Sequence, residues 1–234
     1  MVSDRRSDAD HVVGSKVSLG SGAENRAEEK LPLATAAGAS RVGAAPADGT
    51  DSLSRIYLVR HGRAAADWGS HADPELDDVG RTQAEAMAKE LAPKGPLPLI
   101  ASPLRRTRET AAALERRWGM GARIEPRVGE IPSPVEDLGA RAEWLRGIMQ
   151  CRWPELAEPL QRWRETVVEA LRALSEDAVV VSHYVAINVA VATALEDQRV
   201  TCFRPDYCSC TVLDVVDGRL VLIELGGQGA TRVL

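Results

Sequence analysis

The stretch "RIYLVRHG", residues 55–62, runs from an apolar segment straight into a group of polar residues. The apolar residues within Ile56–Val59 predict a buried β-strand. Arg60 and His61 follow where this strand ends, and Gly62 comes directly after them. Because ligands in open α/β sheets bind beyond the carboxyl ends of the strands, this junction indicates a functional site at one edge of a sheet.

Further apolar runs alternate with helical patterns along the chain. The last two runs flank Asp217-Gly218, a dipeptide that favours a tight hairpin turn. Alternating strands and helices predict an α/β fold, here a three-layer sandwich with a mainly parallel central sheet, helices on both faces and a C-terminal antiparallel hairpin. The predicted strands are Ile56–Val59, Leu97–Ala101, Ala178–Ser182, Thr211–Val216 and Leu220–Leu225, and the predicted helices are Arg81–Leu91, Pro103–Trp118, 160–174 and Val185–Leu195.

Composition divides the 234 residues into two parts. Residues 1–52 are rich in Ala, Gly, Ser and charged residues, and a segment of this kind cannot bury enough apolar surface to offset its ordering entropy. We therefore predict a disordered tail over 1–52, in which His11 has no role, and a catalytic domain over 53–234.

Charge and hydropathy exclude several functional classes. The net charge of -5 argues against a nucleic-acid partner, which needs a basic face. No apolar run is long enough to span a membrane, and the N-terminal residues lack the features of a secretory signal, so a cytoplasmic protein is expected. No metal or other cofactor is expected, because the cysteines form no CxxC pair and the histidines do not complete a zinc set. The cysteines are Cys151, Cys202, Cys208 and Cys210.

Two further strands end in residues that could join Arg60 and His61. The run that ends at Ala101 leads through Ser102-Pro103 into a helix whose first turn carries Arg105. The run "VVVSHYVA" ends in Ser182 and His183. If these strands are parallel neighbours, two imidazoles and two guanidiniums meet at one edge of the sheet.

Such a cluster suits phosphoryl transfer. Arginine holds phosphate oxygens in a bidentate fork and stays charged. Two guanidiniums would also keep His61 neutral, so that it can attack phosphorus and form a phosphohistidine. Arg60, Arg105 and a cationic His183 would then stabilise the phosphoryl oxygens, and Gly62 would keep side chains away from the anion.

The leaving group needs a proton, which a carboxylic acid could supply. The segment "RVGEIPSPVED" offers Glu130, Glu136 and Asp137. Glu130 follows a short apolar stretch and precedes two prolines that would fix the loop, so Glu130 is the predicted donor, with the other two as alternatives.

These motifs resemble those of the histidine phosphatase superfamily, the phosphoglycerate-mutase-like fold. The resemblance rests on "LVRHG" (58–62), "LDDVGRTQA" (76–84), "SPLRRTRETA" (102–111) and "VVVSHYVAINVAV" (179–191), and it spans roughly Arg55 to the end of the chain. It implies that His61 is phosphorylated, that Arg60, Arg105 and His183 bind the phosphoryl group, that Glu130 donates the proton, and that no metal is needed.

The chain departs from the usual pattern of this family at three positions. Ala64 stands where many members have Thr or Ser, Asp67 where many have Asn, and Tyr184 where many have Gly after the second histidine. Asp67 would repel phosphate unless it points away, and Tyr184 could narrow the pocket or bind the substrate.

The resulting hypothesis is a metal-independent phosphatase that hydrolyses small phosphate monoesters through a phosphohistidine on His61. One alternative is a phospho-ligand binding protein without turnover. The other is a phosphoglycerate-type mutase, which the absence of an "ERHYG"-like motif disfavours. The partner is a small phosphorylated metabolite, and the sequence does not indicate an oligomeric state.

Overall fold

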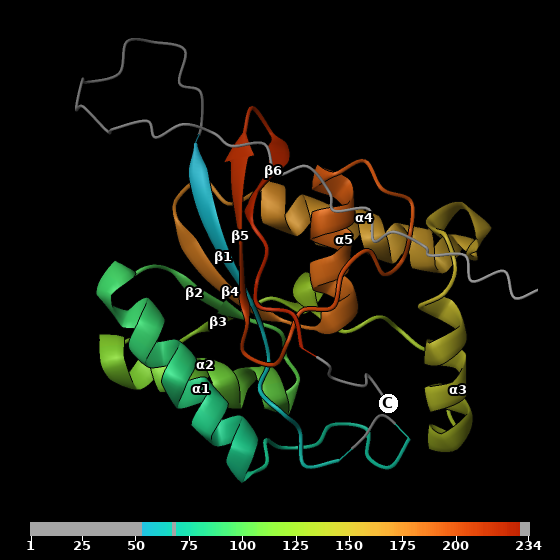
Figure 1. Ribbon diagram of the computed structural model, residues 1–234, viewed down its shortest axis with the longest axis horizontal. Coiled ribbons are helices and arrows are strands. Elements are labelled where there is room, and N and C mark those ends of the chain that lie inside the picture. The colour runs from blue at the N-terminus through green and yellow to red at the C-terminus, as the bar shows by residue number, and fades with distance from the viewer. Residues whose placement is uncertain (1–52, 67–68, 230–234) are drawn as a thin grey trace, which may run out of the picture. The chain divides into compact units, whose positions relative to one another are not determined.

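The computed structural model describes residues 53–66 and 69–229, which form a six-stranded sheet with helices on both faces (Figure 1). The strand order is β3-β2-β4-β1-β5-β6. The pairs β1–β4, β2–β4 and β2–β3 are parallel, whereas β5 runs antiparallel to both β1 and β6. The predicted α/β fold class is therefore confirmed. The strands are β1 Ser54–Arg60, β2 Leu99–Ala101, β3 Arg123–Ile124, β4 Ala178–Ser182, β5 Cys210–Val216 and β6 Arg219–Glu224.

The helices cover the two faces because the buried strands alternate their side chains between two cores. Val179 and Val181 of β4 pack with α1 and α2, while Val180 packs with α4 and α5 and with Leu145 of α3. Successive side chains of a strand point to opposite faces of the sheet, and this alternation produces the two cores. The helices are α1 Asp78–Leu91, α2 Arg105–Trp118, α3 Leu138–Ile148, α4 Glu158–Arg172 and α5 Tyr184–Ala194, with short 3-10 turns at Ala92–Lys94, Pro126–Val128 and Trp153–Glu155.

The four predicted helices all begin one to three residues away from the observed starts, and two of these differences have a local cause. Helix α1 begins three residues before Arg81, because the side chain of Asp77 accepts a hydrogen bond from Gly80 N at 2.7 Å and caps the helix. Helix α2 begins at Arg105 rather than at Pro103, since the backbone of Leu104 is still extended.

The position of β4 in the sheet decides where the site forms. It lies between β2 and β1, with Ser182 opposite Arg60 on one side and Val181 opposite Ala101 on the other. The three strand ends that carry polar residues are therefore adjacent and point in the same direction. This juxtaposition is the one expected from the sequence.

A glycine pair fixes the chain where it leaves β1. A Cβ atom on Gly62 would lie 2.6 Å from the carbonyl oxygen of Gly80, and one on Gly80 would lie 2.0 Å from that of Arg63. Only glycine permits these contacts, so the loop after β1 can pack against the first turn of α1.

Some predictions concern residues outside the described ranges. These are the tail over 1–52 with His11, and Asp67. Among the described residues, every helix is too short or too polar to cross a membrane.

Candidate active site

The two predicted histidines lie next to each other at the ends of β1 and β4. Their ring centroids are 5.2 Å apart, and both rings are buried. His61 Nδ1 lies 2.7 Å from the carbonyl oxygen of Gly62. Because a carbonyl can only accept, Nδ1 carries the proton and the lone pair of His61 resides on Nε2. On the other ring, His183 Nε2 lies 2.7 Å from the hydroxyl of Ser102.

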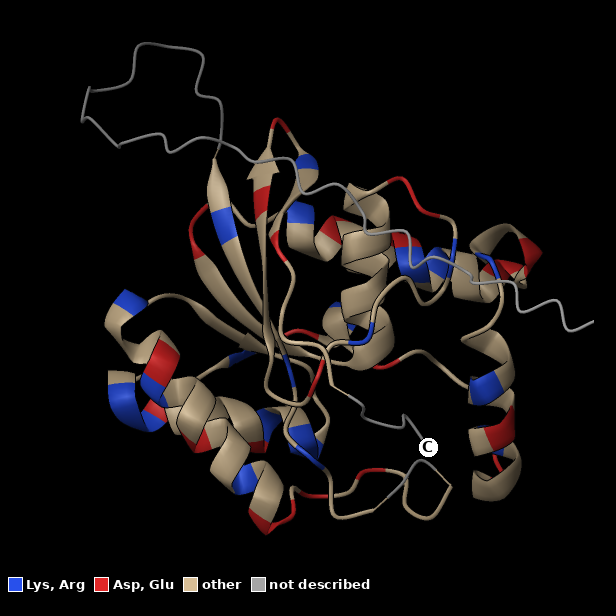
Figure 2. Ribbon diagram, viewed as in Figure 1, with Lys and Arg blue, Asp and Glu red and all other residues tan. Residues whose placement is uncertain are grey.

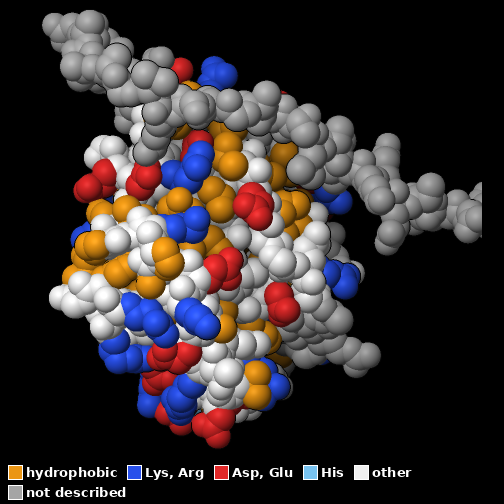
Figure 3. All heavy atoms as spheres, turned by 60° about the vertical axis from the view of Figure 1, so that its left-hand side comes forward, with side chains coloured by type: hydrophobic (Ala, Val, Ile, Leu, Met, Phe, Trp, Pro, Cys, Tyr) orange, Lys and Arg blue, Asp and Glu red, His pale blue; other side chains and the backbone are white. Residues whose placement is uncertain are grey.

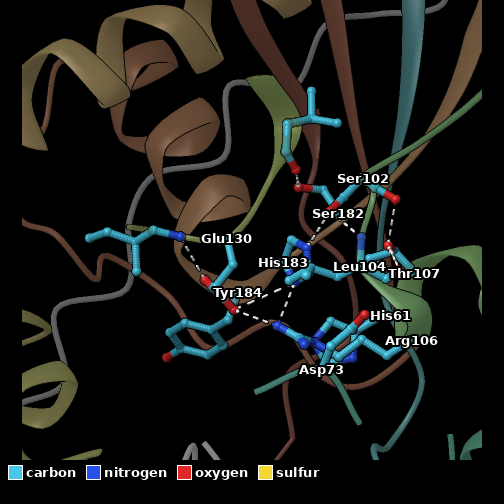
Figure 4. Close-up of polar contacts among 12 residues, drawn as sticks. His61, Asp73, Ser102, Leu104, Arg106, Thr107, Glu130, Ser182, His183 and Tyr184 are labelled. Atoms are coloured by element: carbon cyan, nitrogen blue, oxygen red, sulfur yellow. Dashed lines mark hydrogen bonds and ion pairs between the residues drawn. The ribbon is translucent and has the colours of Figure 1, made fainter. Parts of the chain in front are cut away.

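Arg106 joins the histidines to an acidic side chain (Figure 4). Its Nε donates to His61 Nε2 at 3.2 Å. One terminal nitrogen of the same guanidinium lies 3.2 Å from His183 Nδ1 and 3.3 Å from Glu130 Oε2. The side chain of Arg106 is only 5% exposed. The guanidinium of Arg106 therefore contacts both imidazoles and the carboxylate of Glu130.

Arg105, the arginine predicted to bind phosphate, lies outside this cluster, so that assignment is wrong. Its side chain is 50% exposed and forms ion pairs with Glu75 and with Glu109. Successive residues on a helix point about 100° apart, so only one of two adjacent arginines can face the histidines. Figure 2 shows acidic and basic residues interspersed along α1 and α2, and Figure 3 shows acidic and basic side chains next to one another on one face of the molecule.

A signal in the sequence could have identified Arg106. In the pattern SPxxR[AT]xxT, the arginine stands four residues after the serine, which is Arg106 when counted from Ser102. Thr110 and Ala113 are buried on the same face of α2, four and seven residues further on. The helical period of these small residues therefore places Arg106 toward the sheet.

Arg60 lies at the cluster, as predicted, and is 3% exposed. One terminal nitrogen donates to the carbonyl oxygen of Pro205 at 2.9 Å. The guanidinium carbon lies 3.9 Å from the ring centroid of Tyr207 and 5.1 Å from that of Tyr184. Burial lowers the pKa of Arg60. Sequence reasoning missed Tyr207, which lies in a loop before β5 and belongs to none of the recognised motifs.

The carboxylate at the cluster is Glu130 and not either alternative. Its side chain is 9% exposed, and Oε2 lies 3.5 Å from His183 Nδ1. Asp137 instead caps α3 by accepting from Ala140 N at 2.8 Å, and Glu136 is exposed. The loop that follows β3 thus brings one acid to the histidines.

Burial and the two arginines control the charge of the histidines. The pKa of His61 lies well below its usual value, because the ring is desolvated and because Arg106 and Arg60 oppose a further positive charge. The pKa of His183 is also lowered, mainly by burial and next by Arg106. His61 is therefore neutral, as expected. The sequence predicts a cationic His183, but the lowered pKa favours the neutral form of this ring in the site without a bound anion.

The cluster favours an anion over a metal ion. The ligand atoms of His61, Glu130 and His183 lie within 4.8 Å of one another, close enough to share a metal. Arg106, however, donates to each of them. A cation would have to displace this guanidinium, whereas a phosphate group could accept its hydrogen bonds.

Comparisons with known proteins agree with the fold and the motifs. Residues 56–227 match the histidine phosphatase superfamily (branch 1). A glucosyl-3-phosphoglycerate phosphatase from Mycobacterium tuberculosis (strain CDC 1551 / Oshkosh) is 39% identical over 80 residues, which make up 32% of this chain and 36% of that protein. "Probable phosphoglycerate mutase GpmB" from Erwinia tasmaniensis is 30% identical over 163 residues, which make up 61% of this chain and 75% of that protein.

The match to the mycobacterial relative thus spans only about a third of its length, 36%. A solved structure of mycobacterial glucosyl-3-phosphoglycerate phosphatase in complex with VO3 superposes with a TM-score of 0.55 at 24% identity. The superposition covers 75% of this chain and 100% of that chain. At this identity, the similarity concerns the fold.

Proposed function

Because this chain belongs to the histidine phosphatase superfamily, we propose that it is a phosphatase that hydrolyses small phosphate monoesters through a phosphohistidine on His61. The observation that carries the proposal is the position of Arg106, which donates to His61 Nε2, His183 Nδ1 and Glu130 Oε2. A phosphoryl group bound at His61 would accept these donors and place the carboxyl group beside the leaving oxygen.

In the first step, the lone pair of His61 Nε2 forms a bond to phosphorus while the ester P–O bond breaks. Arg106 and Arg60 hold the phosphoryl oxygens, on which negative charge is concentrated. The bound dianion raises the pKa of His183, which then takes up a proton and adds a further donor. Glu130, as the carboxylic acid, gives its proton to the departing alkoxide.

In the second step, the carboxylate of Glu130 takes a proton from a water molecule, whose oxygen attacks phosphorus. The N–P bond breaks, inorganic phosphate leaves, His61 returns to its neutral form, and His183 gives back to solvent the proton that it took up from solvent in the first step. Each residue thus ends the cycle as it began.

We propose a phosphorylated sugar or a similar small metabolite as the substrate class. The mycobacterial relatives are named glucosyl-3-phosphoglycerate phosphatases, and the match covers about a third of their length, 36%. Tyr184, which lies 5.1 Å from the Arg60 guanidinium, borders the phosphate position and would contact the substrate.

The test is hydrolysis of para-nitrophenyl phosphate in the presence of a chelator. Wild type should turn over, and His61→Ala should not. After a base-quenched reaction with 32P-labelled substrate, an alkali-stable and acid-labile label should be found on wild type alone. Phosphate binding without hydrolysis would leave a binding protein, and exchange between isomeric phosphoglycerates would indicate a mutase.

A further inference from the structure

The ring of Tyr207 covers one face of the Arg60 guanidinium, with 3.9 Å between the guanidinium carbon and the ring centroid. We propose that Tyr207 is a positioning residue that orients Arg60 for phosphate binding. This inference rests on the phosphate site proposed above. It adds a residue that none of the recognised motifs contains.

The contacts of Arg60 leave one edge of its guanidinium for a ligand. A terminal nitrogen is taken by the carbonyl oxygen of Pro205 at 2.9 Å. Nε is buried and has no hydrogen-bond partner among the described residues. A buried donor without an acceptor is costly, so this Nε indicates that an oxygen atom is bound there during function. With one nitrogen held by Pro205, the orientation of the remaining edge depends on Tyr207, which is the nearer of the two rings beside the guanidinium, 3.9 Å against 5.1 Å for Tyr184.

The loop that carries Tyr207 is fastened to β1 on one side. Cys208 N donates to the carbonyl oxygen of Arg60 at 3.0 Å, and Arg60 N donates to that of Ser209 at 3.1 Å. These two hydrogen bonds bracket the arginine that the ring covers. The backbone of Arg60 and the backbone next to Tyr207 are therefore joined by hydrogen bonds on both sides of the arginine.

The C-terminal segment fastens the same loop on its other side. Asp206 N donates to the carbonyl oxygen of Gly227 at 2.9 Å. A Cβ atom on Gly229 would lie 2.4 Å from the carboxyl carbon of Asp206, so the segment approaches as closely as a glycine allows. Pro205 also forms an isolated bridge with Gln228. These attachments on two sides fix the position of the loop, as the proposed role of Tyr207 in positioning Arg60 requires.

Tyr207 also lies near the reacting atoms. Its ring centroid is 6.0 Å from that of His61, and its side chain is only partly buried, unlike those of the two histidines. An aromatic face over a guanidinium is attractive, and the attraction grows when water is excluded, as it is here. Losing the ring should therefore weaken phosphate binding through Arg60.

The experiment measures the affinity for inorganic phosphate by calorimetry, together with kcat/KM for para-nitrophenyl phosphate. Tyr207→Leu should weaken phosphate binding by about tenfold, the size of a desolvated cation–π contact. Tyr207→Phe keeps the ring and should recover most of that loss. Tyr57→Leu is the matched control, because Tyr57 lies on β1 with Arg60 but its ring lies 5.2 Å from the ammonium of Lys94 instead, and the substitution should leave phosphate binding unchanged.

A double-mutant cycle shows whether Tyr207 acts through Arg60. In an Arg60→Ala background, Tyr207→Leu should cause no further loss of phosphate affinity. If the two substitutions lower the affinity for phosphate additively, or if Tyr207→Leu binds phosphate as tightly as wild type does, the proposed positioning role of Tyr207 is wrong. If the leucine variant does not fold, Tyr207→Met repeats the measurement with an unbranched apolar side chain. If wild type binds phosphate but does not hydrolyse para-nitrophenyl phosphate, the proposed function is wrong, whereas the positioning role of Tyr207 is unaffected.

Discussion

Replacing each of two adjacent arginines tests how the site is built. In Arg106→Met, the fork that contacts His61, His183 and Glu130 is lost, while an unbranched apolar side chain still fills the space. Arg105→Met is the matched control, because its side chain is half-exposed and pairs with surface carboxylates.

The expected magnitude follows from the number of donors lost. Arg106 directs two nitrogens, Nε and a terminal nitrogen, toward the atoms around the phosphate position. Removing one preorganised donor of this kind costs about 10²–10³ in kcat, so the loss of both should lower kcat by on the order of 10³ or more. Arg105→Met should stay within about threefold of wild type, as surface substitutions usually do.

The assay is the steady-state hydrolysis of para-nitrophenyl phosphate, measured from pH 4 to pH 8 in steps of about half a unit. Because Arg106 helps to lower the pKa of His61, its removal should also move the acid limb of kcat/KM to higher pH. Thermal unfolding of each variant checks that the fold is kept. A folded Arg106→Met with activity within tenfold of wild type, or a large loss in Arg105→Met, would refute the reasoning.

Three further predictions follow from the site and the fold. Glu130→Gln should lower kcat/KM by about 10²-fold or more for alkyl phosphates but much less for para-nitrophenyl phosphate, because kcat/KM reports the formation of the phosphohistidine, in which a good leaving group needs no proton; equal losses of kcat/KM would contradict this role. The pKa values of His61 and His183 are lowered in the folded protein, so below about pH 6.5 the unfolded chain binds more protons than the folded one. The free energy of unfolding should therefore decrease as the pH falls from about 6.5, which urea titrations at several pH values would show. Gly80→Ala should destabilise the protein by about 1–3 kcal/mol in the same titrations, because its Cβ would meet a backbone oxygen, whereas Gly121→Ala, which meets no atom within 4 Å, should not.

The fold could be predicted from the sequence because its strands are apolar runs with polar residues at their ends. The prediction for β4, Ala178–Ser182, matches the observed strand residue for residue. Helix α3 was not among the predicted helices, since Leu145 is its single buried residue and its amphipathic pattern is weak. The strand β3 has only two residues, Arg123–Ile124, too few for an alternating pattern that would distinguish it from a short apolar stretch before Glu130.

The site could be predicted only in part, and the reasons are geometric. His61 and His183 were found because each follows a strand, and a strand end fixes where its next side chains lie. Choosing between Arg105 and Arg106 required the phase of a helix, which depends on the residue at which the helix begins. Tyr207 reaches the site through contacts of its loop with β1 and with the C-terminal segment, which no local pattern encodes.

The pairing of β1 with β4, which are far apart in the sequence, has a consequence for the nascent chain during synthesis. On the ribosome, His61 emerges long before His183, and the segment that presses Tyr207 onto Arg60 emerges later still. A growing chain therefore exposes His61, the proposed nucleophile, before the groups that contact it in the folded protein have been made. Synthesis that stops early should yield an inert fragment, and catalysis should switch on only when nearly all of the polypeptide is free to fold.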